Sequence, residues 1–142
     1  MRPADIYFHK EGGKLRLPNT QILSRWIEQV VKMEGRDLGT LTFIYCSDVY
    51  LRAISHKYLK INNITDVIAF EYNEVTMVSG DIFISVDRVR ENASYYKIPL
   101  QTELRRVMVH GLLHLIGYRD KTAKDKCAMT GKEDLYLSLH FQ

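Results

Sequence analysis

The sequence predicts one α+β domain over residues 1–142, with strands mainly in the first two thirds of the chain and helices that cover them. Three observations support this prediction. The length of 142 residues lies near the commonest size of a single domain. Hydrophobic residues make up 46% and charged residues 26% of the chain, which is the balance of a globular protein and excludes a disordered one. Short β-branched and aromatic runs also occur beside segments whose apolar residues recur at helical spacing.

The first half of the chain is predicted to alternate strands with helices. Asn19 or Thr20 offers a side-chain oxygen that can cap the first helix, and Gly35 can end it. Ser47 or Asp48 can cap the second helix, after a run of β-branched and aromatic residues typical of a buried strand. The expected elements are a strand at 4–9, a helix between 20 and 35, a strand at 39–46, a helix at 48–59 and a strand at 66–70.

The second half is predicted to be mainly helical. Gly80 and Asp81 precede the last expected strand, and Pro99 ends the helix that follows it. Gly117 ends the next helix, which is the most apolar of the chain. The expected elements are a strand at 82–86 and helices at about 87–96, 102–116 and 122–139.

The charge of the chain is nearly balanced, because 20 Lys and Arg residues face 17 Asp and Glu residues for a net charge of +3. Such an excess does not by itself indicate nucleic-acid binding. Basic residues gather in the last third, as a solvated helix face or as a surface that faces phosphates. No apolar stretch reaches the roughly 18 residues of a membrane span, and residues 1–6 lack the apolar core of a secretory signal. We therefore expect a cytoplasmic protein with no membrane partner.

The most informative segment is 109–120. His110 and His114 are four residues apart, so on a helix they lie one turn apart on the same face, about 6 Å along the axis. Gly117 can reverse the chain, since glycine adopts the left-handed conformation at little cost, and the reversal would bring Asp120 toward both imidazoles. Two nitrogens, one carboxylate oxygen and an open fourth position form the pattern of a catalytic zinc site. The alternatives are a satisfied core histidine pair and an aspartate that serves as a turn-former or helix cap.

Segment 110–120 resembles the carboxy-terminal signature of the YbeY family, which comprises bacterial metal-dependent endoribonucleases of ribosomal RNA maturation. The family signature reads His-Gly-x-Leu-His-Leu-x-Gly-Tyr-Asp-His. Upstream, the segments at 65–70 and 80–82 resemble the family's Thr-Asp-Val-Leu-Ser-Phe strand and its Gly-Asp-Ile. Met129 and Glu133 match a methionine and a glutamate of the family's last helix. The similarity covers about residues 41–137, in the order of the family.

This resemblance implies a zincin-like α+β fold with a small mixed sheet, a metal-binding helix near the carboxy terminus and one zinc ion held by His110, His114 and Asp120. It implies cleavage of single-stranded RNA in ribosomal RNA processing (16S rRNA 3′-end maturation) and ribosome quality control. The implied partners are ribosomal RNA and ribosomal particles, with no small-molecule organic cofactor. The third ligand of the family is histidine, so Asp120 is a departure; its harder oxygen ligand makes manganese or iron possible.

Catalysis of phosphodiester cleavage would also use positive charge, because negative charge grows on the phosphoryl oxygens in the transition state. Lys60 and Arg119 are the candidates, and Lys60 follows Leu59, which occupies the position where the family usually has arginine. Both can instead be solvated surface charges. The candidate catalytic residues are therefore His110, His114, Lys60 and Arg119.

Two other functions remain open from the sequence. One is a zinc metallopeptidase-like hydrolase, although such peptidases carry a glutamate directly after the first histidine and this chain has Gly111 there. The other is a non-catalytic ribosome-associated factor with a structural metal. A fourth ligand from Cys127 would favour this last function, but its distance from His114 in the sequence gives no spacing support.

Overall fold

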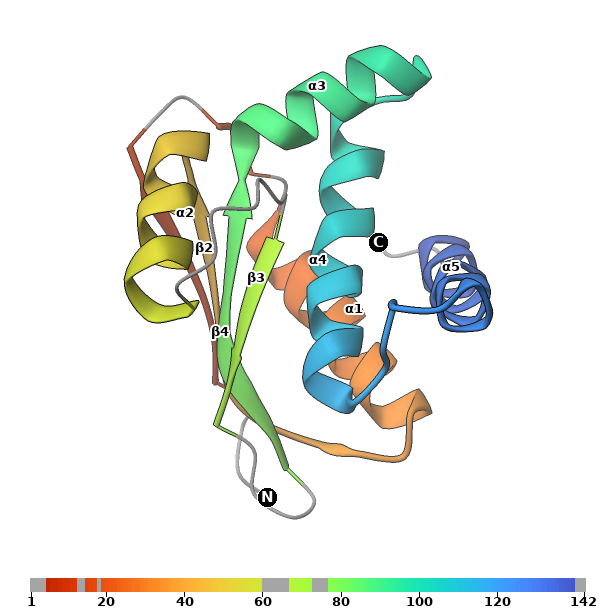
Figure 1. Cartoon of the computed structure of the whole chain (residues 1–142). Helices are drawn as coiled ribbons and strands as arrows, with labels where there is room; N and C mark the ends of the chain where they lie inside the picture. The colour runs from red at the N-terminus through yellow and green to blue at the C-terminus, as the bar shows by residue number, and fades with distance from the viewer. Residues whose placement is uncertain (1–4, 13–14, 18, 60–66, 73–76, 140–142) are drawn as a thin grey trace.

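A computed structural model describes residues 5–12, 15–17, 19–59, 67–72 and 77–139 of the chain (Figure 1). Its elements are β1 (Asp5–Glu11), α1 (Thr20–Met33), β2 (Asp37–Cys46), α2 (Asp48–Ile54), a π-helical turn (Ser55–Leu59), β3 (Val67–Glu71), β4 (Met77–Ser85), α3 (Val86–Tyr96), α4 (Leu100–Ile116) and α5 (Ala123–Leu137). Over these described ranges, no helix has both the length and the apolar character that crossing a bilayer requires.

The strands form a four-stranded mixed sheet in the order β1-β2-β4-β3. Strands β1 and β4 run parallel to β2, whereas β3 runs antiparallel to β4 at the edge. Phe8, Phe43 and Ile82 lie side by side across the three parallel strands. Strands β2 and β4 are rich in buried apolar residues, as expected for central strands with both faces covered.

Helices cover both faces of this sheet. Figure 1 shows α2 on one face, α1 and α4 on the other, and α5 beyond α4. The main core lies on the side of α1 and α4, and its largest fully buried side chains include Trp26, Phe43, Ile82, Leu104, Met108 and Leu112. A smaller apolar cluster beside α2 contains Cys46, Leu51 and Ile68. The prediction of an α+β fold with a mixed sheet covered by helices is confirmed.

Gly80 and Asp81 differ from their predicted place, because they lie inside β4 and not before it. The strand begins at Met77, and a Cβ on Gly80 would stand 2.3 Å from the carbonyl oxygen of Phe70 in β3. The glycine is therefore required by the close approach of two strands, and not by a turn. The carboxylate of Asp81 accepts a hydrogen bond from the hydroxyl of Tyr72 at 3.0 Å.

Pro99 also has a different role from the predicted one. Helix α3 ends at Tyr96, and Lys97 follows in the left-handed conformation with φ of 55°. Pro99 is then the N-cap residue of α4, whose first residue is Leu100 instead of the predicted Thr102. A proline is tolerated there because the N–H that it lacks would have no helical partner.

Candidate metal centre

Helix α4 can lie close to the sheet because it carries Gly111 where it crosses β3 and β4. A Cβ at this position would stand 2.7 Å from Cγ2 of Ile82 and 3.0 Å from Cγ2 of Val67. Any larger side chain would push the helix away from both strands. The same packing leaves no room for the glutamate that zinc peptidases carry directly after their first histidine.

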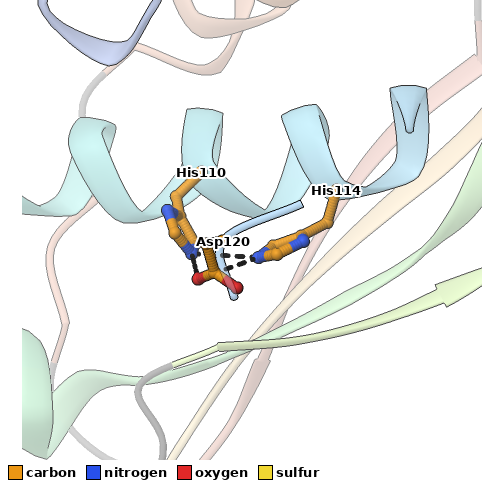
Figure 2. A group of neighbouring side chains, drawn as sticks. All are labelled: His110, His114 and Asp120. Atoms are coloured by element: carbon orange, nitrogen blue, oxygen red, sulfur yellow. Dashed lines mark hydrogen bonds and ion pairs between the residues drawn. The ribbon is translucent and has the colours of Figure 1, made fainter. Parts of the chain in front are cut away.

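The chain reverses at Gly117, as predicted. This residue has φ of 124°, in the region that favours glycine. The backbone N–H of Tyr118 donates to the carbonyl of Leu113 at 3.0 Å, which is the long closing bond of a Schellman motif. The reversal brings Asp120 next to the two histidines of α4, as Figure 2 shows.

Three potential ligand atoms face one another in this cluster, which we call the His-Asp cluster. Nε2 of His110 lies 3.1 Å from Nε2 of His114, and Oδ2 of Asp120 lies 3.4 Å from the first nitrogen and 3.6 Å from the second (Figure 2). Ligands held at bond lengths of about 2.0–2.1 Å in a tetrahedral zinc site are themselves about 3.4 Å apart. The triangle therefore has the size of a metal site. The side chains are 24%, 30% and 39% exposed, so an ion can reach them from solvent.

Burial favours the neutral form of His114. Its pKa lies below the ordinary value of 6.5 because burial of the ring, and then the neighbouring His110, disfavour the protonated form. Asp120 and a hydrogen bond with the backbone of Tyr118 oppose this shift without reversing it. A neutral imidazole keeps the nitrogen lone pair that a metal needs.

Glu133 of α5 orients His110 from behind. One of its carboxylate oxygens lies 2.6 Å from Nδ1 of His110, and the other accepts a hydrogen bond from Arg106 at 3.0 Å. The Glu133 side chain is only 8% exposed. Since Nδ1 faces Glu133, Nε2 is the ring nitrogen directed into the His-Asp cluster, and a carboxylate behind a histidine is a common outer partner in metal sites. In the sequence, Glu133 stands out only as a match to the family, because 23 residues separate it from His110.

The remaining candidates are Lys60, Arg119 and Cys127. Lys60 lies outside the described residues. Arg119 is exposed in the turn. A hydrogen bond with the backbone of Thr122 lowers the pKa of Asp125, and the charge of Arg119 lowers it further. Cys127 is exposed on α5 and does not belong to the group of potential ligands that the described part of the chain forms. The structure thus brings together His110, His114 and Asp120, but it gives no support to a fourth ligand from Cys127.

Comparison with known proteins agrees with this arrangement. A family model described as Endoribonuclease YbeY matches residues 8–140. The chain belongs to the YbeY family. The protein named Endoribonuclease YbeY of Amoebophilus asiaticus is 42% identical over 138 residues, which are 96% of this chain and 94% of that protein. The protein of the same name of Cytophaga hutchinsonii is 41% identical over 140 residues, or 98% of each chain.

A solved structure also resembles this fold. A solution structure of a protein from Thermotoga maritima matches with a TM-score of 0.62 and 27% identity, and the match covers 93% of this chain and 86% of that one. The YbeY family match starts in β1 and so includes α1, which the sequence motifs alone did not reach. The predicted resemblance is confirmed. At the position where the YbeY signature ends in histidine, Asp120 places a carboxylate at the third corner of the cluster.

Proposed function

We propose that this chain is a metal-dependent endoribonuclease of ribosomal RNA processing. It cleaves single-stranded RNA in 16S rRNA 3′-end maturation and in ribosome quality control, as one domain over residues 1–142 that acts on ribosomal particles in the cytoplasm. The observation that carries this proposal is the triangle of ligand atoms at 3.1, 3.4 and 3.6 Å. It occurs in a chain whose relatives are named Endoribonuclease YbeY.

His110, His114 and Asp120 are the proposed ligands of one divalent cation. Two imidazoles and one carboxylate suit zinc, and the oxygen ligand also makes manganese or iron possible. Three protein ligands leave a coordination position open, as catalytic zinc sites do. When bound, such an ion polarises a phosphoryl oxygen and lowers the pKa of water.

Other side chains support the centre or contribute charge. Glu133 holds His110 in the orientation that points Nε2 into the cluster, and Arg106 balances the charge of Glu133. Arg119 precedes Asp120 and is exposed, so its guanidinium is available to a phosphate of bound RNA. Lys60 is the second proposed phosphate contact. Replacing Arg119 or Lys60 with alanine should slow RNA cleavage and leave the metal content unchanged.

No observation favours either alternative function, the metallopeptidase-like hydrolase or the non-catalytic factor with a structural metal. A peptidase of the His-Glu-x-x-His type needs a carboxylate where Gly111 packs against Ile82 and Val67. A structural metal usually has four protein ligands, whereas the group formed by the described residues has three.

The test is metal quantitation on wild-type protein and His114→Ala, both purified without added metal, with a cleavage assay on ribosomal RNA. We expect metal and cleavage in the wild type and neither in the variant. His56→Ala is the matched control, because His56 is exposed on the π-helical turn. Incubation with an unfolded protein tests the peptidase alternative. Absence of metal from the wild type, or equal cleavage by wild type and His114→Ala, would contradict the proposal.

A further inference from the structure

A second polar cluster lies beside the Gly117 turn. Its centre is Glu34, at the end of α1, whose side chain is only 6% exposed. The carboxylate accepts hydrogen bonds from the hydroxyl of Tyr118 at 2.6 Å, from the ammonium of Lys132 at 3.1 Å and from the hydroxyl of Tyr136. We call these four residues the Glu34 cluster. Lys132 and Tyr136 belong to α5, whereas Tyr118 belongs to the turn that carries the third proposed ligand.

Arg36 contacts the same turn from the same side. Its Nη1 donates to the carbonyl of Ile116 at 3.1 Å. Residues 34 and 36 lie between α1 and β2 and so hold the chain immediately before and immediately after Gly117. Both contacts join segments that are 80 or more residues apart in the sequence.

Contacts at Ile116 and Tyr118 flank the Gly117 turn on both sides. A Cβ on Gly117 would have no atom within 4 Å, so open space lies where a side chain would project from the glycine. The backbone bonds of the Schellman motif fix how α4 ends. They leave the path of residues 119–121 to other contacts. Tyr118 connects His114 with Asp120. Its backbone forms a hydrogen bond with the ring of His114, and Asp120 follows two residues later.

We propose that Glu34 is a positioning residue of the metal centre, which acts through Tyr118 and is assisted by Arg36 through Ile116. The contacts set the path of the Gly117 turn so that the carboxylate of Asp120 reaches the two imidazoles. The inference rests on the proposed metal-binding function. Lys132 balances the charge of Glu34, so this carboxylate is already paired and does not compete for the cation.

A purely structural role of Glu34 would be to tie α1 to α5 through Lys132 and Tyr136. The two roles can be separated because two tyrosines donate to the same carboxylate from different segments. Tyr118→Phe removes the link to the ligand-bearing turn. Tyr136→Phe removes an equivalent phenol hydrogen bond and leaves that link in place. The two variants are therefore a matched pair.

The experiment titrates Zn²⁺ into the metal-free full-length chain of the wild type and both variants, by chelator competition. We expect Tyr118→Phe to weaken Zn²⁺ binding by about 3- to 10-fold, the effect of losing one hydrogen bond that positions the turn. Tyr136→Phe should bind Zn²⁺ with an affinity close to that of the wild type. Hydrogen exchange of the backbone amides of residues 117–121, measured without metal, should become faster in Tyr118→Phe alone.

Equal Zn²⁺ affinities in the two variants, or unchanged exchange at 117–121 in Tyr118→Phe, would overturn the positioning role and leave the proposed function standing. If the wild type binds no Zn²⁺, the metal-binding function fails, and the exchange data still decide whether Glu34 orders the turn. Arg36→Met is the second variant should Tyr118→Phe not fold. It should also weaken Zn²⁺ binding, and an unchanged affinity would contradict the proposal that contacts from residues 34 and 36 position the Gly117 turn.

Discussion

The Glu34 cluster and the His-Asp cluster flank the same glycine turn, but their carboxylates differ in pairing and in exposure. The Glu34 cluster contains its own cation, since the carboxylate pairs with Lys132 at 3.1 Å. In the His-Asp cluster, the ion pairs that Asp120 makes with described residues are those with His110 and His114. The first carboxylate is 6% exposed and the second is 39% exposed.

This difference separates a cluster that stabilises the fold from one that is ready to bind a ligand. A buried carboxylate surrounded by three donors is satisfied within the protein. Two imidazole nitrogens and a carboxylate oxygen within 4.8 Å of one another are instead satisfied by a proton or a cation. The His-Asp cluster is thus the one of the two that can bind a cation.

The largest effect should follow removal of a proposed ligand. Asp120→Ala should reduce RNA cleavage by about 1000-fold or more, roughly 4 kcal/mol, because the stabilisation that a bound ion gives to the transition state is lost. Single-turnover cleavage of single-stranded RNA measures it. The metal-free variant should unfold at the wild-type temperature or slightly above. A large loss of stability without metal would show that this cluster also stabilises the fold, and the contrast between the two clusters would disappear.

Removal of the buried Glu34 carboxylate, in contrast, should destabilise the fold even without metal. Glu34→Ala should lower the free energy of unfolding of the metal-free protein by about 3 kcal/mol, because two phenols and an ammonium lose a charged acceptor. Urea unfolding measures it. Glu28→Ala is the matched control, since Glu28 is exposed on the same helix, and it should change stability by at most about 0.5 kcal/mol. A loss in Glu34→Ala no larger than in this control would contradict the prediction.

A smaller effect is expected from Glu133→Gln, which sharpens the comparison inside the His-Asp cluster. The amide keeps the volume of Glu133 and removes the charge behind His110, so Zn²⁺ affinity should fall by about 10- to 100-fold. Asp134→Asn is the control, because Asp134 contacts the same Arg106 at 2.8 Å but lies 60% exposed. Zn²⁺ titration of both variants measures the effect. Equal affinities would show that Glu133 serves only to bind Arg106.

The smallest effect is a pH dependence that belongs to the Glu34 cluster. Burial raises the pKa of Glu34, but hydrogen bonds from Tyr118, Tyr136 and Lys132 outweigh it, so the net pKa lies below the ordinary value of 4.5. The stability that this ionised group contributes is therefore fully present above pH 4.5 and is lost as the pH falls through the lowered pKa. The stability difference between wild type and Glu34→Gln should shrink in acid. A difference that stays constant from pH 7 to pH 3 would contradict this assignment.

Local rules predicted much of the fold and the core of the site. Apolar spacing and the Asn19 cap predicted α1, and the side chain of Asn19 does accept hydrogen bonds from the backbone N–H groups of Gln21 and Ile22. Helical periodicity and the glycine stop predicted that His110, His114 and Asp120 meet. Gly80 shows the limit of such rules, because a glycine pressed against another strand looks in the sequence like a glycine in a turn.

The sequence by itself therefore determined which potential ligand atoms meet, since the rise and turn of a helix and the freedom of a glycine are properties of the backbone over a few residues. Only the tertiary structure decided that the carboxylate of Glu34 pairs with the ammonium of Lys132, whereas that of Asp120 faces the two imidazoles. Lys132 and Glu34 are 98 residues apart, and Glu133 and His110 are 23 apart. Contacts at such distances depend on how α1, α4 and α5 pack together, and no local pattern encodes that packing.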